Sequence, residues 1–461
     1  MIDAALLLAR LLLGLAALFL MGYAWLGLVM PRLNDLALGE KAAASFALGA
    51  VLLTLWMLAL AWAGAAYSLG VILVPLLGLG LLLSLTPRGR QVWRRGAIQT
   101  AGPAPKRLNA WDWLFLTLLF TLLLFTTLRA ILYPMWAWDA LATWGYKAKV
   151  FYLAQGMDFS RFEAHNYYPN LIPLLLTYLY FCLGQVQDAL VQGVFTLWGG
   201  LTLGLLYSLS RRLGLSRTQT LGLTAFLALN GTVFITHLYI AYADLPLAFF
   251  TLGAAACIYL WLAGPAPAGS LGLAAIFMAG LAWCKYEGPP LAGTMILAAA
   301  FTLAWLRPSD LWRRLKGLSL PAAGMLAGYL PWRLFALSQG IPMGSDHVHS
   351  FYAHQLWGAA PYLAAALANP YYFGVLWPGV VLAAIAAGRR LWTGPGLFLA
   401  VFLAGNLAAV LLAYALAPTS AAEFASYVRA TLDRLLLHLT PTAALFAALC
   451  LADREWLAIS S

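Results

Sequence analysis

The sequence predicts an all-α polytopic membrane protein. Of its 461 residues, 63% are hydrophobic and 9% are charged, whereas a soluble domain of this length carries about 25% charged residues. Leu- and Ala-rich runs recur along the chain, many of them close to the roughly 20 residues that a membrane-spanning helix needs. The apolar–polar alternation of strands is absent, and lipid requires a backbone that satisfies its own hydrogen bonds. We therefore expect a bundle of helices.

About 13 apolar runs are expected to cross the membrane. The first is too long for the core of a signal peptide and lacks a basic start and a small-residue cleavage site, so we interpret it as a retained helix. The apolar segment 171–184 is too short to cross and is expected to dip into the outer leaflet. The expected spans are 4–30, 42–63, 68–85, 111–133, 189–208, 218–238, 245–263, 271–284, 290–306, 318–338, 372–388, 395–417 and 435–450.

Lys and Arg collect in short loops, and this bias predicts the orientation of the chain. Basic residues without any acid fill 86–110, and more fall in 211–217, 307–317 and 389–390. The positive-inside rule places these loops in the cytoplasm. The net charge of +11 is therefore attributed to contact with membrane lipids, and no nucleic-acid partner is expected.

The same orientation gathers the polar loops on the outer side: 134–188, 242–246, 285–290, 339–371 and 418–434. We expect a bacterial inner or plasma membrane protein whose active site faces outside. The basic linker 86–110 is predicted to separate an accessory three-helix unit, 1–85, from a catalytic transmembrane domain, 111–461. The outer loop 134–188 is expected to carry the catalytic residue.

Asp139 is the leading candidate in that loop, where it follows Trp136 and Trp138. One interpretation is an interfacial aromatic belt with a solvated or helix-capping Asp. The other is a general base, because a carboxylate among indoles in a partly dry pocket can be tuned to accept a proton. We favour the base.

Basic residues near the outer boundary are candidates for binding a phosphate. Lys147 and Lys149 could equally reach lipid headgroups. Lys285 ends a hydrophobic helix beside Glu287, so the two form either a neutralised pair or one polar substrate site. Arg429 and Arg434 precede the last span, where arginine suits bidentate phosphate capture or contact with the interface.

Asp244 lies two residues before Pro246 in a Tyr-Ala-Asp-Leu-Pro turn. It is either a helix N-cap or an outward acid that, with Tyr242, binds a sugar hydroxyl or, as a weak candidate, a metal. His165, Tyr168 and Trp138 are further candidates for contacting substrate. A metal cluster at His347, His349 and His354 is disfavoured because only Asp346 accompanies it, so no metal site is predicted. The four Cys are single residues in apolar segments and predict neither a disulfide nor a zinc site.

Taken together, residues 111–450 resemble the glycosyltransferase C (GT-C) superfamily, and within it the dolichyl-phosphate-mannose–protein mannosyltransferases of family 39. Asp139 matches the catalytic Asp of the first large outer loop. The sequence departs from many members at Ala140, where a second acid is usual, and it lacks the large outer soluble domain of the oligosaccharyltransferases. The other similar motifs are Ala148-Lys149 with Gly156, Tyr168-Pro169-Asn170, the turn at Asp244, Cys284-Lys285-Tyr286-Glu287-Gly288, and Arg434 with Pro441.

The resemblance implies an inverting hexosyl- or pentosyltransferase. It would move a sugar from a polyprenyl-phosphate donor to a hydroxyl of a glycan, lipid or protein acceptor on the outer face. The departures favour a monosaccharide-phosphate donor. No cofactor is indicated, and a divalent metal is left open. The alternatives are a transporter or flippase of a lipid-linked or anionic solute, and a ligase or polymerase of lipid-linked glycans. Arg129 and Arg333 are the charges nearest to mid-membrane.

Overall fold

The computed structural model describes residues 2–30, 33–86, 89–90, 107–161, 165–264, 268–342, 350–417 and 419–452, which contain helices and turns and no strand. The first half comprises α1 (Ile2–Val29), η1 (Leu33–Asp35), α2 (Leu38–Trp62), α3 (Leu69–Leu85), α5 (Ala110–Leu132), η2 (Ala140–Trp144), α6 (Gly145–Leu153), α7 (Leu171–Leu183), α8 (Asp188–Arg212), α9 (Arg217–Leu229) and α10 (Thr232–His237). The second half comprises α11 (Asp244–Ala263), α12 (Ser270–Cys284), α13 (Gly288–Leu306), α14 (Leu311–Gly317), α15 (Ser319–Ser338), α16 (Ala353–Ala368), α17 (Pro370–Phe373), α18 (Leu376–Ala387), α19 (Arg390–Thr393), α20 (Gly396–Leu416), α21 (Ala421–Leu437) and α22 (Thr440–Leu451).

The all-helical membrane architecture is confirmed, but the number of spans is not. Among the described residues, seven helices are long and apolar enough to cross a membrane, or eight if α21 and α22, which meet at 48°, form one bent span. The expected span 218–238 is divided between α9 and α10 at Asn230 and Gly231, where Gly231 takes a φ of +100°. A positive φ favours glycine and interrupts the helical pattern. The span 372–388 is likewise divided between α17 and α18.

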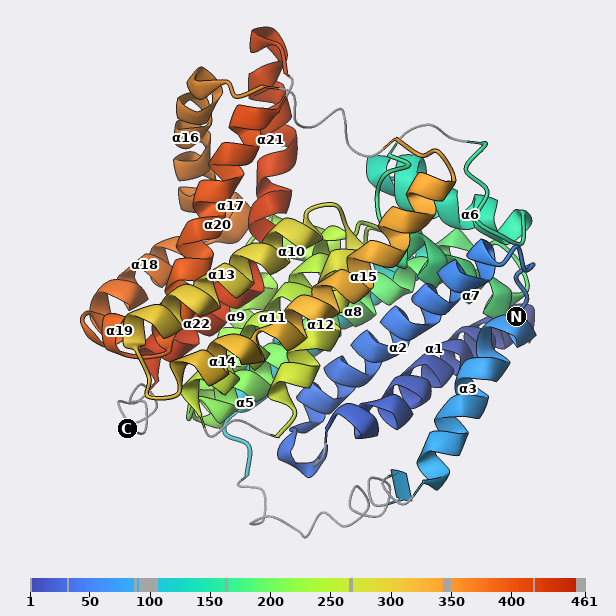
Figure 1. The fold of residues 1–461 in the computed structure, drawn as a ribbon, viewed down its shortest axis with the longest axis horizontal. Helices are drawn as coiled ribbons and strands as arrows, with labels where there is room; N and C mark the ends of the chain where they lie inside the picture. Colours follow the sequence, from blue (N-terminus) through green and yellow to red (C-terminus); the bar gives the residue numbers. More distant parts are fainter. Residues whose placement is uncertain are drawn as a thin grey trace.

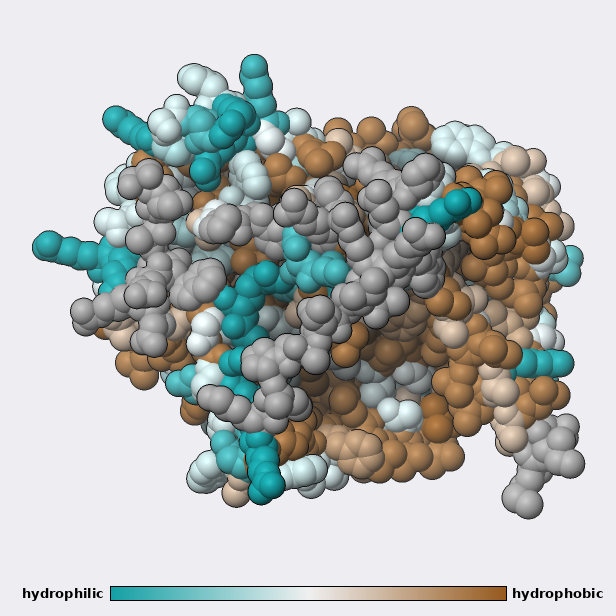
Figure 2. Space-filling model, turned by 90° about the horizontal axis from the view of Figure 1, so that it is seen from below, coloured by the Kyte–Doolittle hydropathy of each residue, from teal (hydrophilic) through white to brown (hydrophobic). Residues whose placement is uncertain are grey.

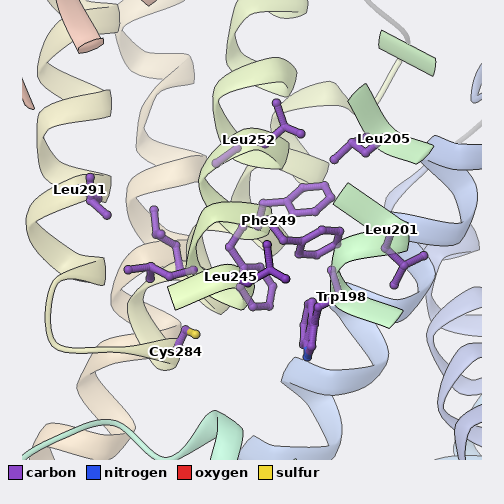
Figure 3. Close-up of a cluster of buried hydrophobic side chains, with 14 of the residues drawn as sticks. Trp198, Leu201, Leu205, Leu245, Phe249, Leu252, Cys284 and Leu291 are labelled. Carbon is purple, nitrogen blue, oxygen red and sulfur yellow. The ribbon is translucent and has the colours of Figure 1, made fainter. Parts of the chain in front are cut away.

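The core lies where α2, α8, α11 and α12 pack together. Trp198 of α8 packs edge-on against Phe46 of α2 and Phe249 of α11, and Figure 3 shows its ring beside Leu245, Phe249 and Leu201. Through Phe46, α2 therefore shares one core with the later helices. The domain boundary at 86–110 stays a prediction, because residues 91–106 lie outside the described residues.

Helix α7 corresponds to the segment expected to dip into the membrane. It has 13 residues, too few to cross a bilayer. Its side chains are almost all buried, and the hydroxyl of Tyr178 donates to the carbonyl of Gly14 in α1 at 2.8 Å. Protein rather than lipid thus covers this helix, and its depth in a membrane stays a prediction.

Two ends of the bundle carry most of the charge. At one end, Arg212 pairs with Glu40 at 2.6 Å and Arg217 pairs with Asp112 at 2.6 Å. Figure 2 shows the molecule from below, with hydrophilic residues standing among hydrophobic ones. At the other end, α16, α20 and α21 rise beyond the other helices (Figure 1). We call this the site end, because the candidate residues described below gather there.

The contact between α12 and α15 depends on glycine. A Cβ atom at Gly328 would lie 2.1 Å from the carbonyl oxygen of Ala279, so the two backbones touch directly. Small residues allow this close approach of helices in membranes. We predict that Gly328→Ala lowers the free energy of unfolding by about 1–3 kcal/mol through overpacking, measured by thermal unfolding in detergent. Gly293→Ala, where a Cβ meets nothing within 4 Å, is the control. Equal melting temperatures for the two variants would contradict the prediction.

Candidate active site

The carboxylate of Asp244 is the centre of the polar cluster at the site end. Its side chain is fully buried. Oδ1 accepts from Lys285 Nζ at 2.8 Å and lies 2.9 Å from His438 Nε2. Oδ2 accepts from Arg434, from Nη2 at 3.0 Å and from Nε at 3.2 Å. A buried carboxylate is tolerated only when it is paired and hydrogen-bonded, and Asp244 meets both conditions.

Local structure directs Asp244 into this cluster. The N-cap of α11 is Ala243, and no side chain caps the helix, so the predicted N-cap role of Asp244 is wrong. Pro246 lies in the first turn of α11, where the missing N–H costs nothing. The carboxylate therefore does not cap α11 and instead contacts Lys285 and Arg434.

Arg434 joins the two candidate acids. Besides Asp244, its Nη2 donates to Asp139 Oδ2 at 2.5 Å. Its guanidinium also lies 4.7 Å from the centre of the Tyr242 ring, an arrangement that adds a cation–π attraction. Arg434 is in the last turn of α21, just before the bend into α22. The bend therefore brings the end of one helix onto acids from two others.

Asp139 is held at the edge of the cluster. Its side chain is 21% exposed, and its backbone N–H donates to the hydroxyl of Tyr242 at 3.2 Å. Its carboxylate caps no helix. The next residues form a π-helical turn, η2, that leads into α6, and such turns are frequent at functional sites.

Lys285 and Glu287 occupy the tight turn between α12 and α13. Lys285 Nζ lies 3.0 Å from Glu287 Oε1 as well as contacting Asp244. Burial has the largest single effect on Glu287 and would raise its pKa, but the charges of Lys285 and His438, with the hydrogen bond from Lys285, together lower that pKa. Burial would likewise lower the pKa of Lys285, yet Asp244 and Glu287 raise it. A Cβ at Gly288 would lie 1.8 Å from the Leu281 carbonyl oxygen, so the turn requires glycine.

An aromatic wall borders the cluster. The Tyr168 ring lies 4.9 Å from Tyr167 and 6.3 Å from Tyr286, centre to centre. Burial, followed by the nearby charge of Glu287, raises the pKa of Tyr168 well above its usual value. His165, with a φ of +56°, packs 5.3 Å from Tyr168. His165 and Tyr168 therefore lie beside the cluster, as candidates for contacting substrate should.

Several predicted residues lie apart from the cluster. Lys149 pairs with Asp188 at 2.5 Å, and Arg429 lies 5.8 Å from the centre of the Tyr362 ring. Lys147 is fully buried and donates to the His165 carbonyl oxygen at 2.6 Å. Burial lowers its pKa to about 7. Trp138 is 76% exposed.

Two histidines in the cluster were not expected. His438 follows Arg434 by four residues, so both lie on one face of the helix. His237 ends α10, and its Nε2 is 4.0 Å from Asp244 Oδ2. Burial lowers the pKa of His237 to about 4, and its Nδ1 lies 2.7 Å from the Val233 carbonyl oxygen. His237 is therefore neutral at pH 7 and carries its proton on Nδ1.

The candidates for binding a metal are Asp244 and three histidines. Within the described part of the chain, no group of three or more His, Cys, Asp or Glu residues is placed to hold a metal ion. Lys285 and Arg434 both contact Asp244, and their charges would repel a cation there. His347 and His349 lie outside the described residues, and His354 contacts the Tyr352 ring.

An apolar groove of about 700 Å³ lies between α16, α18, α19, α20 and α22. Its lining includes Leu367, Trp377, Val381, Leu403 and Phe446, and most of its surface is nonpolar. Phe446 is on α22, the helix that continues from the segment carrying Arg434 and His438. Phe446 therefore links the groove to the cluster along the chain, eight residues after His438.

Loss of the central charge should destabilise the protein. We predict that Asp244→Asn lowers the free energy of unfolding by about 3–5 kcal/mol, because Lys285 and Arg434 would be left buried without their shared carboxylate. Thermal unfolding in detergent measures this effect. The control is Asp158→Asn, which breaks the Arg161 pair in the outer loop and should cost less than about 1 kcal/mol. A similar loss in both variants would contradict the central role of Asp244.

Comparison with known proteins identifies the fold. No family model and no curated protein sequence matches the chain. A crystal structure of ArnT from Cupriavidus metallidurans bound to undecaprenyl phosphate is similar, with a TM-score of 0.54 and 16% identity over 76% of this chain and 61% of that chain. The apo structure of the same protein gives 0.52 and 16% over 75% and 60%. The chain thus spans about three-fifths of the length of these ArnT structures. It has an all-helical fold similar to that of ArnT.

Proposed function

We propose that the protein is a glycosyltransferase. It moves a sugar from a polyprenyl-phosphate donor to a hydroxyl acceptor at the site end of the bundle, on the outer face of the membrane. The observation that carries the proposal is Arg434, which binds Asp139 and Asp244 at once. A cation that bridges two acids beside Lys285 is a ready site for a phosphate. The arrangement also leaves a carboxylate next to that phosphate.

The apolar groove supports a lipid-linked donor. A phosphate at Arg434 would lie above α22, whose Phe446 lines the groove. An isoprenoid tail needs a nonpolar path of this kind, because burying each CH₂ group contributes about 0.8 kcal/mol. The ArnT fold gives independent support, since one ArnT structure contains undecaprenyl phosphate.

The proposed reaction is a single inverting displacement. Asp139 takes the proton of the acceptor hydroxyl as its oxygen forms a bond to the anomeric carbon. The bond from that carbon to the phosphate oxygen breaks, and the electron pair leaves with the polyprenyl phosphate. Arg434 and Lys285 neutralise the growing charge on the phosphate, a form of electrostatic stabilisation that costs no reorganisation when the cations are already in place. Glu287, Tyr168, Tyr242 and His165 would contact the sugar.

The phosphate and Asp139 compete for Arg434. In the structure Asp139 Oδ2 accepts a hydrogen bond from Arg434 Nη2 at 2.5 Å, so this oxygen is occupied by the guanidinium. When the donor phosphate takes the guanidinium, Asp139 is released to accept a proton. Donor binding would thus create the base that the transfer requires.

The acceptor classes consistent with this proposal are glycans, lipids and proteins. Protein is the acceptor of the mannosyltransferases that the motifs resemble. A ligase or polymerase would use the same cluster but take a pyrophosphate-linked donor. A transporter would need charges along a path through the bundle, whereas the charges described above gather at helix ends.

The first test is turnover. Purified protein in detergent is supplied with a panel of undecaprenyl-phosphate sugars and membrane extracts as acceptor. Asp139→Asn should reduce transfer by at least about 100-fold, in line with the usual contribution of a general base. Asp158→Asn should transfer at the wild-type rate. Near wild-type transfer by Asp139→Asn would remove Asp139 as the base, and turnover of pyrophosphate-linked donors alone would favour the ligase.

The second test is competition for Arg434, measured as the thermal stabilisation of each variant over a titration with undecaprenyl phosphate. Asp139→Asn should bind this lipid about fivefold more tightly, because a competing ion pair worth about 1 kcal/mol is gone. Arg434→Gln should bind it at least about tenfold more weakly, since a charge-assisted contact is lost. Weaker binding by Asp139→Asn would contradict the competition.

A further inference from the structure

Arg129 is a cation that the proposed reaction does not use. It lies in the last turn of α5, a helix of which only 17% is buried. Its neighbours Leu128 and Leu132 are 43% and 76% exposed. In a membrane these leucines face lipid, so Arg129 is at a lipid-facing surface near the site end.

The guanidinium of Arg129 is held by two tyrosines. It stacks 3.8 Å from the centre of the Tyr133 ring and lies 5.6 Å from that of Tyr239. Helix α8 fixes the backbone on both sides: Gln192 Nε2 donates to the carbonyl oxygen of Tyr133 at 3.4 Å, and Thr196 Oγ1 donates to that of Leu238 at 2.7 Å. The rings of Tyr133 and Tyr239 therefore orient the Arg129 guanidinium, and hydrogen bonds from α8 hold the backbone that carries these rings.

Arg129 has no hydrogen bond or ion pair with any described residue of the chain. Other cations near the site end are engaged, with Lys149 on Asp188 and Arg434 on Asp139 and Asp244. A guanidinium has five N–H donors in a planar fork that matches a phosphate. Stacking on rings uses its faces and leaves those donors for a ligand.

We propose that Arg129, Tyr133 and Tyr239 bind the phosphate of a membrane phospholipid. The lipid-facing surface of α5 would accommodate the acyl chains while the guanidinium takes the phosphate in two hydrogen bonds. This is a second anion site, separate from the one at Arg434, and it needs no sugar chemistry.

The position of the site connects the lipid to Asp139. Tyr133 begins the segment that ends at Asp139, and Tyr239 precedes Tyr242, whose hydroxyl accepts the Asp139 N–H. A phosphate that holds Arg129 between its tyrosines restrains both segments. Resting on the proposed function, the phospholipid thus positions the catalytic loop without contacting substrate.

The experiment compares lipid retention by native mass spectrometry of the purified protein in detergent. The probes are dioleoylphosphatidylglycerol, dioleoylphosphatidylcholine and inorganic phosphate. The wild type should retain phosphatidylglycerol, and Arg129→Gln should retain it about tenfold less, the loss expected for a charge-assisted contact. Arg129→Lys keeps the charge but not the fork and should be intermediate. Tyr239→Leu keeps the arginine but removes one ring, and should also lower retention.

Arg161→Gln is the matched control, because it removes one outer-loop charge that already pairs with Asp158. It should retain phosphatidylglycerol as the wild type does. Unchanged retention by Arg129→Gln and Tyr239→Leu would overturn the proposal. If phosphatidylglycerol and phosphatidylcholine were retained equally and inorganic phosphate displaced both, the ligand would be free phosphate and the phospholipid proposal would be wrong. Arg129→Gln should bind undecaprenyl phosphate as the wild type does. Retention of phosphatidylglycerol therefore tests the Arg129 site, and binding of undecaprenyl phosphate tests the Arg434 site of the proposed function.

Discussion

The buried charge of Asp244 is the constraint on which the site end depends. A carboxylate removed from water is tolerated only with partners, and its partners come from two places far apart in the sequence: Lys285 after α12, and Arg434 with His438 at the end of α21. Each partner reaches Asp244 only if its helix ends at the same depth. The lengths of α12 and α21, the tight turn at Gly288 and the 48° bend must therefore all be compatible with contacts to the Asp244 carboxylate.

Charge balance indicates how an anion could enter such a site. Asp139, Asp244 and Glu287 face Lys285 and Arg434, so acids outnumber the permanent cations. An incoming phosphate must therefore displace a carboxylate. Asp244 is fully buried and is held by Lys285, Arg434 and His438 together, whereas Asp139 is 21% exposed and has Arg434 as its ion-pair partner. Of the two carboxylates that Arg434 holds, Asp139 is displaced at the lower cost, and it is the carboxylate that the proposed reaction needs unpaired.

The sequence predicts the helical class and the end of the bundle at which the chemistry gathers. Composition suffices for the class, and the bias of Lys and Arg places Asp139, Asp244, Lys285, Glu287 and Arg434 on one side, where the structure brings them together. The sequence does not predict which side chains pair, because pairing depends on tertiary packing. Nothing in the sequence indicates that Lys149 pairs with Asp188, or that His438 rather than Arg429 joins the cluster. The number of spans is not confirmed; within the expected span 218–238, hydropathy does not register the break at Gly231.

The pairing of Arg434 with Asp139 also bears on the choice between water and the acceptor in the proposed reaction. A free carboxylate beside a reactive donor can activate water as readily as an acceptor hydroxyl. With Arg434 bound to Asp139, one oxygen of the proposed base is occupied until a phosphate displaces it, and the rings of Tyr167, Tyr168 and Tyr286 pack together beside the cluster. Proton transfer then depends on two events, capture of the phosphate and arrival of the acceptor. A single arginine shared between the base and the leaving group is sufficient to couple them.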